Sequence, residues 1–306
     1  MNQPNQDRRK TIESGTQANS VSCWTCGSCD FECPVYIHSS RLRPQVIVRL
    51  ANLGCLDELM GMPEIWYCLN CRRCMDVCPN LVKPVSIIAY SRQEAIGSGK
   101  IGWNVYRRYQ LLFSRFQRIR WRTVKVCLHD ELDSMTQSQW IEWLNNPVSE
   151  PPETIYLKSV KFGTAFHDSI KQAKISSCFT CGECSSACPV SCERSVFDPR
   201  AIFRMINLGM IEELLKSPSA WLCVGCGRCS DACSQLVDGR RMIDEIKKYA
   251  YDNGIVDVNF PLRLERANRI IFNHFLNEID FLFGRESAAR LTVLRHYGTD
   301  KRRQRV

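Results

Sequence analysis

The stretch CLNCRRCMDVCP, residues 68–79, spaces four cysteines by three, three and four residues and ends in proline. The same pattern occurs at three other places, which we number with it along the chain. Run 1 is CWTCGSCDFECP (23–34), run 2 is the stretch just quoted, run 3 is CFTCGECSSACP (178–189) and run 4 is CVGCGRCSDACS (223–234). Sixteen of the nineteen cysteines lie in these runs. The chain must therefore contain something that needs sixteen ordered thiol groups.

Length and composition indicate a globular protein of about two domains. The chain has 306 residues, 44% of them hydrophobic, and a net charge of +9 at pH 7. At this length each half can bury a core of its own. No segment approaches the roughly 18 consecutive apolar residues of a membrane span, and the start MNQPNQDRRK lacks the apolar region of a signal peptide. We therefore expect a cytoplasmic protein.

That location favours metal binding over disulfide bonds. Thiols in the cytosol are kept reduced, so a dense cysteine pattern there indicates a metal site. The odd total of nineteen cysteines agrees with this interpretation. The alternative, a disulfide scaffold, is usually a far shorter secreted domain with an export signal.

The chain contains an internal duplication. Run 1 begins 45 residues before run 2, as run 3 does before run 4, so the halves superimpose at an offset of 155 residues. Many residues besides cysteine match at this offset: Pro44 and Pro199, Arg49 and Arg204, the Asn-Leu-Gly triplets at 52–54 and 207–209, Leu59 and Leu214, Pro63 and Pro218, and Trp66 and Trp221. Two copies of one module explain this agreement.

The segment between the two runs of a module is predicted to form two short helices. In RPQVIVRLANLGCLDELMGMPEIW (43–66) the apolar residues recur at helical spacing, with breaks at Gly54 and Pro63. The equivalent DPRAIFRMINLGMIEELLKSPSAW (198–221) adds Asp198 as a candidate N-cap and Pro199 at the first helical position. Neither segment has the pattern of a strand, so we predict a mostly α-helical ferredoxin fold.

The sequence divides into five parts. We expect a disordered tail at 1–20, a first helical ferredoxin module at 21–100, and a helical connector and linker at 101–165. A second helical ferredoxin module follows at 166–252, and a C-terminal helical extension at 253–306. In the connector, WLNNPVSEPPETI (143–155) marks a proline-rich linker. In the extension, a helix is predicted over 260–283, with Ile271, Phe275, Ile279 and Leu282 on one side.

The cysteine spacing is typical of 4Fe-4S clusters. A cubane of four irons and four sulfides has four corners, each of which takes one thiolate. Three cysteines at intervals of three residues can surround one cube, whereas the fourth, before proline, can reach a neighbouring cube. Zinc usually takes two separated CxxC pairs. A zinc-binding interaction protein nevertheless stays open as the alternative from another class.

The exchange of fourth ligands known from two-cluster ferredoxins predicts four sites. Each site takes three cysteines from one run and the fourth from the other run of its module. Site 1 is Cys23, Cys26, Cys29 and Cys78, and site 2 is Cys68, Cys71, Cys74 and Cys33. Site 3 is Cys178, Cys181, Cys184 and Cys233, and site 4 is Cys223, Cys226, Cys229 and Cys188. The expected cofactors are four 4Fe-4S clusters.

Both modules resemble the iron–sulfur C subunit of heterodisulfide reductase, present twice in tandem. The resemblance covers 20–96 and 175–251, and it includes the cysteine runs, the Asn-Leu-Gly triplet and the tryptophan before the second run. It implies an electron-transfer protein that relays single electrons between two partners. One would be a flavoprotein like the A subunit of that reductase, and the other a catalytic protein with CCG motifs like its B subunit. One departure is Ser234, which stands where the other runs have proline.

The sequence shows no motif for substrate chemistry of its own. No two cysteines are adjacent, which excludes a CCG motif within this chain. There is no GxGxxG for a dinucleotide, GSGKIG at 97–102 does not fit a phosphate loop, and HDELD at 129–133 is not HExxH. We therefore expect a non-catalytic subunit of an oxidoreductase complex.

A basic segment leaves the choice of partner open. GWNVYRRYQLLFSRFQRIRWRTVK (102–125) has seven basic residues and no acidic one. As a helix it places Arg108, Arg115, Arg118 and Arg122 along one side. This side can be a solvated face of a helix packed on its own modules, a dock for an acidic partner, or a contact with anionic lipid. The last corresponds to the alternative function, a soluble arm exchanging electrons with a membrane quinone protein.

Two further expectations concern partners and the remaining thiols. We expect no nucleic-acid binding, because no nucleic-acid fold is readable beside the clusters. Cys55, Cys127 and Cys192 lie outside the runs, and we interpret them as small buried apolar residues. Of the three, Cys192 is the best candidate for a cluster ligand, because it follows Cys188 by four residues.

Overall fold

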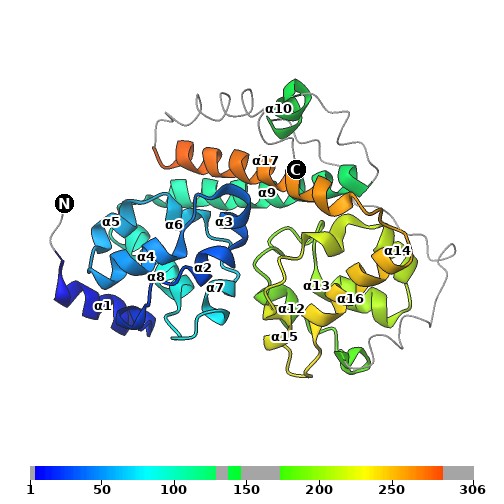
Figure 1. Cartoon of the computed structure of the whole chain (residues 1–306), viewed down its shortest axis with the longest axis horizontal. Coiled ribbons are helices and arrows are strands. Elements are labelled where there is room, and N and C mark those ends of the chain that lie inside the picture. The colour runs from blue at the N-terminus through cyan, green and yellow to red at the C-terminus, as the bar shows by residue number, and fades with distance from the viewer. Residues whose placement is uncertain (1–3, 129–136, 146–172, 285–306) are drawn as a thin grey trace. The chain divides into compact units, whose positions relative to one another are not determined.

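A computed structural model shows a helical protein (Figure 1). The structure describes residues 4–128, 137–145 and 173–284. Within these residues there are α-helices and short 3-10 helices but no strand. The prediction of a mostly α fold with two tandem helical modules is confirmed.

The described residues form two compact units. The first holds 4–68, 77–112 and 272–284, and the second holds 69–76, 113–128, 137–145 and 173–271. Residues 69–76, most of run 2, belong to the second unit although the sequence places them in the first module.

The first module is a series of short helices around the cysteine runs. They are η1 (Ser20–Ser22), α2 (Ser28–Phe31), α3 (Pro34–Ser39), α4 (Pro44–Asn52), α5 (Leu56–Gly61), α6 (Glu64–Tyr67), α7 (Arg73–Asp76) and α8 (Pro84–Gly97). The predicted pair of helices between the runs corresponds to α4 and α5, which are separated at Gly54. Gly54 has φ +72°, and a Cβ there would lie 1.9 Å from the carbonyl oxygen of Asn5. Only glycine fits both conditions.

The second module repeats this order. Its helices are η5 (Ile175–Ser177), α12 (Glu183–Ala187), α13 (Pro199–Asn207), α14 (Ile211–Lys216), η6 (Pro218–Leu222), α15 (Arg228–Asp231) and α16 (Gly239–Asp252). The predicted N-cap of α13 is present, because Asp198 Oδ1 accepts a hydrogen bond of 3.0 Å from the amide of Arg200. In the first module a more distant residue accepts from the equivalent amide at the start of α4. There, Asp30 Oδ1 accepts from the amide of Gln45 at 2.8 Å.

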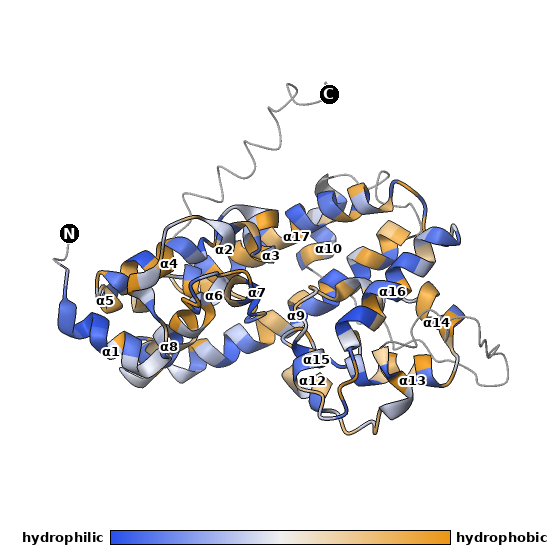
Figure 2. Cartoon of the chain, turned by 60° about the horizontal axis from the view of Figure 1, so that its bottom comes forward, coloured by the Kyte–Doolittle hydropathy of each residue, from blue (hydrophilic) through white to orange (hydrophobic). Residues whose placement is uncertain are grey.

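The prediction of a disordered tail over 1–20 is wrong for the residues described. Gln6–Thr16 forms α1, which is hydrophilic along most of its length (Figure 2). It is held to the first module by the buried Ile12, 1% exposed, and by a hydrogen bond of 2.8 Å from the amide of Asn5 to the carbonyl oxygen of Leu53. Asn5 also caps the helix by accepting from the amide of Arg8. The prediction was wrong because it was based on the polar composition of 1–20, which does not reveal these few contacts.

Three further helices come from the connector and the C-terminal extension. They are α9 (Trp103–Leu128), α10 (Gln137–Asn145) and α17 (Phe260–Leu282). On the predicted apolar side of α17, Ile271, Phe275 and Ile279 are at most 2% exposed, whereas Leu282 is only half-buried. The part of the proline-rich linker that follows residue 145 lies outside the described residues. Among the helices of the described ranges, each is too short or too polar to cross a bilayer.

The basic side of α9 is largely occupied within the second unit. Arg115 donates to the carbonyl oxygens of Leu144 and Asn145 at 2.6 and 3.0 Å. Arg118 pairs with Glu193, and Arg122 lies 5.2 Å from the ring centre of Trp143. These contacts agree with the interpretation of a helix packed on the chain itself.

Candidate metal centres

Each cysteine run has the same backbone turn. The residues two and four positions after the first cysteine are left-handed in all four runs: Thr25 and Gly27, Asn70 and Arg72, Thr180 and Gly182, and Gly225 and Gly227, with φ between 54° and 95°. Left-handed backbone favours glycine and disfavours residues with a Cβ. The turn brings the first three cysteines of a run around one space, and a helical turn then leads to the fourth.

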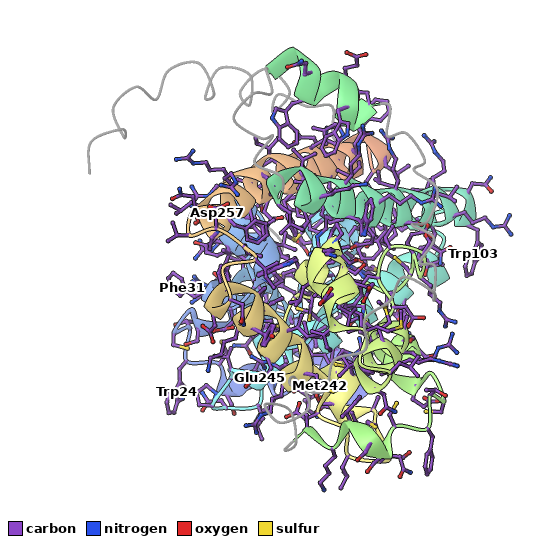
Figure 3. All side chains as sticks on the ribbon, turned by 90° about the vertical axis from the view of Figure 1, so that its right-hand side faces the viewer. Trp24, Phe31, Trp103, Met242, Glu245 and Asp257 are labelled. Atoms are coloured by element: carbon purple, nitrogen blue, oxygen red, sulfur yellow. The ribbon has the colours of Figure 1, made fainter. Side chains whose placement is uncertain are left out.

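The cysteines of site 1 surround a pocket in the first unit. Its lining includes all four predicted ligands, Cys23, Cys26, Cys29 and Cys78, together with the aromatic Trp24. The pocket encloses about 380 Å³, including open solvent at its mouth. Cys26 is exposed, and Trp24, which lines the pocket, projects from the surface (Figure 3). The pocket therefore opens to solvent.

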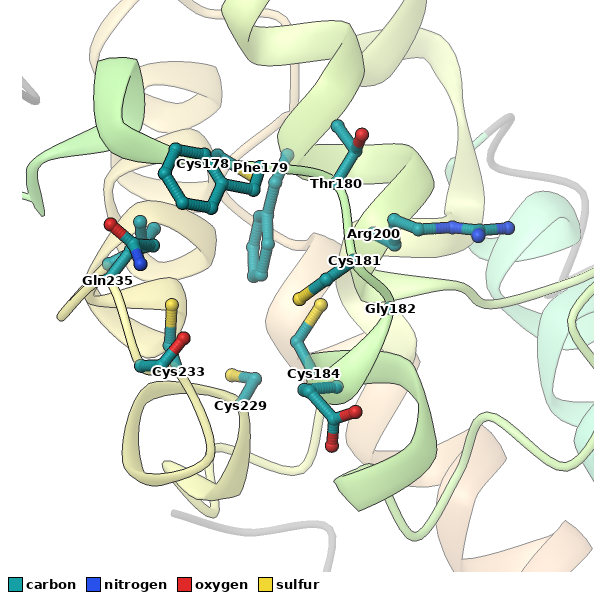
Figure 4. A pocket seen from close by; sticks show the side chains of 14 residues that line it. Cys178, Phe179, Thr180, Cys181, Gly182, Cys184, Arg200, Cys229, Cys233 and Gln235 are labelled. Carbon is teal, nitrogen blue, oxygen red and sulfur yellow. The ribbon is translucent and has the colours of Figure 1, made fainter.

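The cysteines of site 3 surround an equivalent pocket in the second unit. It encloses about 410 Å³ and is lined by the predicted set Cys178, Cys181, Cys184 and Cys233. Figure 4 shows the sulfur atoms of Cys181, Cys184 and Cys233 around a common space, with Cys229 at its edge. Cys181 is exposed, as Cys26 is, and Phe179 takes the place of Trp24.

The cysteines of site 4 lie together more deeply. Cys226 and Cys229 are each 8% exposed. Burial, and after it the neighbouring charges of Cys226 and Cys223, raise the pKa of Cys188 to about 12. Burial likewise raises the pKa of Cys229, with additional contributions from Cys223, Cys226, Cys188 and Cys184. Cys229 therefore stands between sites 3 and 4.

The cysteines of site 2 are all buried, with exposed fractions of 7% for Cys33, 9% for Cys68, 7% for Cys71 and 6% for Cys74. In both modules, therefore, the central cysteine of the first run is exposed and the central cysteine of the second run is buried.

The arrangement fits a cluster with four thiolate corners. None of the nineteen cysteines, all of which lie in the described residues, forms a disulfide bond. Within the described ranges, no three His, Cys, Asp or Glu side chains converge closely enough to hold a single metal ion. The thiols of sites 1 and 3 instead line the walls of a pocket. A cubane, which needs one thiolate at each of its four corners, matches such a donor set.

Comparison with known proteins assigns the chemistry. Residues 19–82 and 174–237 each match the family model described as a 4Fe-4S dicluster domain, and each match contains both cysteine runs of one module. The chain contains two 4Fe-4S dicluster domains in tandem. Two dicluster domains account for four 4Fe-4S clusters, and the zinc interpretation loses its support.

Curated relatives agree with the resemblance to the C subunit of heterodisulfide reductase. The C subunit of the H2:CoB-CoM heterodisulfide,ferredoxin reductase of Methanothermobacter thermautotrophicus is 38% identical over 80 residues, 25% of this chain and 41% of the relative. The iron-sulfur C subunit of the CoB-CoM heterodisulfide reductase of Methanopyrus kandleri is 35% identical over 78 residues, 26% of this chain and 40% of the relative. This chain thus spans about two fifths of the length of these relatives. No solved structure matches the chain.

Both dicluster domains hold a cation beside the first cysteine of their second run. In the first domain, Arg92 donates to the carbonyl oxygen of Cys68 at 2.7 Å and lies 5.4 Å from the ring centre of Trp66. In the second, Lys247 donates to the carbonyl oxygen of Cys223 at 3.4 Å. It lies 5.9 Å from the ring centre of Trp221. Sequence reasoning found the tryptophans but missed the cations, although both pairs match at the offset of 155 residues.

The second dicluster domain has an additional buried cation. Arg120 of α9 is 6% exposed and donates to the carbonyl oxygen of Leu222 at 2.8 Å and to Gln117 Oε1 at 2.8 Å. Burial lowers the pKa of Arg120 to about 10, against the opposing effect of the thiolates of Cys223, Cys188 and Cys192. The guanidinium therefore carries its charge at neutral pH next to site 4.

An acidic group lies next to site 1 in the first domain. Asp30 is 2% exposed, follows Cys29 directly, and accepts a hydrogen bond of 3.0 Å from Arg43 Nε. Burial, and after it the charge of Asp30, raises the pKa of Cys29 to about 12. In the second domain the equivalent residue is Ser185, which donates a hydrogen bond to Asp198. The two domains thus differ in the charges that surround their thiols.

Proposed function

We propose that this chain is an electron-transfer subunit that carries four 4Fe-4S clusters at sites 1 to 4. The observation that carries the proposal is the pair of thiol-lined pockets, each with three cysteines from one run and the fourth from the other. Electrostatic contacts among the cysteines of site 4 support the same exchange, and site 2 follows by the duplication. The clusters would supply one-electron redox chemistry without any bond being made in a substrate.

The residues of the chain would set the environment of each cluster. Hydrogen bonds, nearby charge and solvent exposure tune the potentials of such clusters over roughly −700 to +450 mV. Arg120 and Lys247 place positive charge near site 4, whereas Asp30 places negative charge near site 1. We therefore propose that site 4 has a higher potential than site 1, because a cation stabilises the added electron and an anion opposes it.

The relatives indicate the kind of complex. Their names describe subunits of heterodisulfide reductases. On this basis we propose that the chain works in a heterodisulfide-reductase-like complex in the cytoplasm, between a flavoprotein and a catalytic protein with CCG motifs. The alternative, an arm that meets a membrane quinone protein through α9, finds less support. Arg115, Arg118 and Arg122 already have partners within the chain.

Anaerobic purification tests the proposal. The expected product is brown, contains about 16 irons per chain and gives a low-temperature paramagnetic signal on reduction. Cys26→Ala and Cys181→Ala are each expected to remove about four irons, because each eliminates one corner of one cubane. Cys55→Ala, outside the runs, is the matched control and is expected to retain the full content. A colourless product that contains zinc would contradict the proposal.

A further inference from the structure

The segment that carries run 2 is held by run 4. Arg73 of α7 donates a hydrogen bond of 3.1 Å to the carbonyl oxygen of Val224. In return, Arg228 of α15 donates one of 3.0 Å to the carbonyl oxygen of Asn70. All four residues belong to the second unit. We call these two hydrogen bonds the arginine clasp.

The clasp is reciprocal between the two copies of the module. Arg73 and Arg228 occupy equivalent positions of the duplicated module, and each reaches a carbonyl in the first loop of the other run. Asp76 and Asp231, another equivalent pair, also lie within electrostatic reach of each other. Equivalent surfaces of two copies that contact each other in this way resemble the isologous interface of a homodimer. Here the two copies are joined in one chain.

The segments that the clasp joins carry ligands of two of the four sites. Cys71 and Cys74 lie on the segment that contributes Asn70 and Arg73, and Cys226 lies between Val224 and Arg228. The clasp therefore joins the segment that carries Cys71 and Cys74 of site 2 to the segment that carries Cys226 of site 4. Sites 2 and 4 are also the sites with buried central cysteines, since Cys71 and Cys226 are 7% and 8% exposed.

Sites 1 and 3 have the opposite character in both modules. Their central cysteines, Cys26 and Cys181, are exposed. The aromatic residue after the first cysteine is exposed as well, with 74% for Trp24 and 73% for Phe179. A cluster with an exposed rim is accessible to another protein, whereas the polypeptide covers a buried one.

We propose that sites 2 and 4 form the internal junction through which electrons pass between the modules, and that sites 1 and 3 are the two external ports. This assignment rests on the proposed four-cluster function. One electron leaves the reduced member of the junction and enters the oxidised member, with no bond formed and no proton moved. A one-electron donor protein at one port and a one-electron acceptor protein at the other balance the transfer. The order along the chain's electron path is then 1, 2, 4, 3.

Paramagnetic resonance of paired-site variants tests this order without an activity assay. Reduced clusters are paramagnetic, and two that lie close together broaden each other's signals by dipolar coupling. Cys26→Ala with Cys181→Ala leaves sites 2 and 4, and Cys71→Ala with Cys226→Ala leaves sites 1 and 3. Each variant is expected to retain about 8 irons per chain. The first is expected to give a broadened, coupled signal and the second two narrow, uncoupled ones.

The outcomes separate the order from the function on which it depends. Coupling in the variant that keeps sites 1 and 3, or equal coupling in both variants, would overturn the order while leaving four clusters in place. Absence of any paramagnetic signal from the reduced unaltered chain would refute the four-cluster function itself.

The clasp can also be tested with every cysteine present, which covers the case in which a cysteine variant does not fold. In Arg73→Ala with Arg228→Ala, the paramagnetic signal is expected to lose the broadening that arises from coupling between sites 2 and 4. The broadening that arises from coupling within each module is expected to stay. The matched control is Arg49→Ala with Arg204→Ala, an exposed pair related by the same offset on α4 and α13. Unchanged broadening in the first pair, relative to the control, would overturn the role of the clasp.

Discussion

Arg120 donates a hydrogen bond of 2.8 Å to the carbonyl oxygen of Leu222, the residue directly before Cys223. A guanidinium buried at this position has two effects. It fixes the backbone at the start of run 4, and it places a positive charge next to site 4. Because the reduced form of a cluster carries one more electron, the charge favours reduction there.

Arg120→Gln is therefore expected to lower the reduction potential of site 4, by tens of millivolts on an order-of-magnitude Coulomb estimate for a partly buried charge. Potentiometric titration followed by paramagnetic resonance measures this shift. Arg118→Gln is the control on the same helix, because the side chain of Arg118 is 52% exposed and pairs with Glu193, so solvent screens its charge. An equal shift in both variants, or a rise in Arg120→Gln, would show that burial is not the cause.

A second prediction comes from the backbone of run 2. Arg72 has φ 68° at the position where the other three runs have glycine. A residue with a Cβ is strained in this conformation. Arg72→Gly is expected to stabilise the protein by about 1 kcal/mol or less, since the greater freedom of glycine in the unfolded chain offsets part of the gain.

The reciprocal change provides the control. Gly227→Arg introduces the same strain into run 4, where φ is 73°, and is expected to lower the melting temperature. Arg72→Asn separates strain from charge, because asparagine tolerates the left-handed region and is neutral. Thermal unfolding of the anaerobically purified proteins is the measurement. A loss of stability in both Arg72→Gly and Arg72→Asn would indicate that the charge of Arg72 matters more than its backbone.

The sequence predicted those features that local chemistry determines. The cysteine spacing, the repeat, the break at Gly54 and the cap at Asp198 each depend on a residue and its near neighbours. The four sites follow from the spacing combined with the known exchange of fourth ligands. For sites 1 and 3 the structure gathers the expected cysteines around a pocket.

Features that depend on distant partners were out of reach. Helical periodicity indicates which residues of α9 share a side, but Arg120 is buried because a carbonyl oxygen 102 positions away accepts its hydrogen bond. The arginine clasp joins residues more than 150 positions apart, and nothing local distinguishes Arg73 from its neighbour Arg72. The helix α1 was missed because one buried side chain, Ile12, gives no periodic pattern.

A third prediction concerns the close approach of α16 to site 4. A Cβ on Gly239 would lie 2.4 Å from Phe203 Cζ and 3.0 Å from Cys229 Sγ. Gly239→Ala must therefore displace α16 or the sulfur, which we expect to cost about 1–3 kcal/mol of stability. It is also expected to change the paramagnetic signal of site 4.

Gly97→Ala is the matched control for Gly239→Ala. Gly97 is the last residue of α8, and a Cβ there meets nothing within 4 Å. Because alanine is the better helix former, this variant is expected to be neutral or more stable by up to about 1 kcal/mol. Thermal unfolding and iron content are measured for both. Retention of full iron content and stability in Gly239→Ala would mean that the packing around Cys229 gives way without cost.

The three cysteines outside the runs give a test of the ligand sets that depends on pH. Ligated cysteines are protected from alkylation, and in the cluster-loaded protein only Cys55, Cys127 and Cys192 are expected to be unligated. Cys127 is 0% exposed, and burial raises the pKa of its thiol to about 12. It is expected to react only when the protein unfolds. Cys192 is exposed as a residue, although burial of its sulfur raises the pKa of the thiol to about 11.

Alkylation requires the thiolate, so the labelling rate of Cys192 is expected to rise about tenfold for each pH unit between about 7.5 and 9.5. Over that range the pH stays below the thiol's raised pKa, and only a small fraction is ionised. Mass spectrometry of the cluster-loaded protein measures the rate, and Cys192→Ser identifies the labelled site. If Cys192 is instead protected while the clusters are present and reacts once they are removed, it is a ligand itself. The fourth corner of site 4 would then have to be reassigned from Cys188 to Cys192.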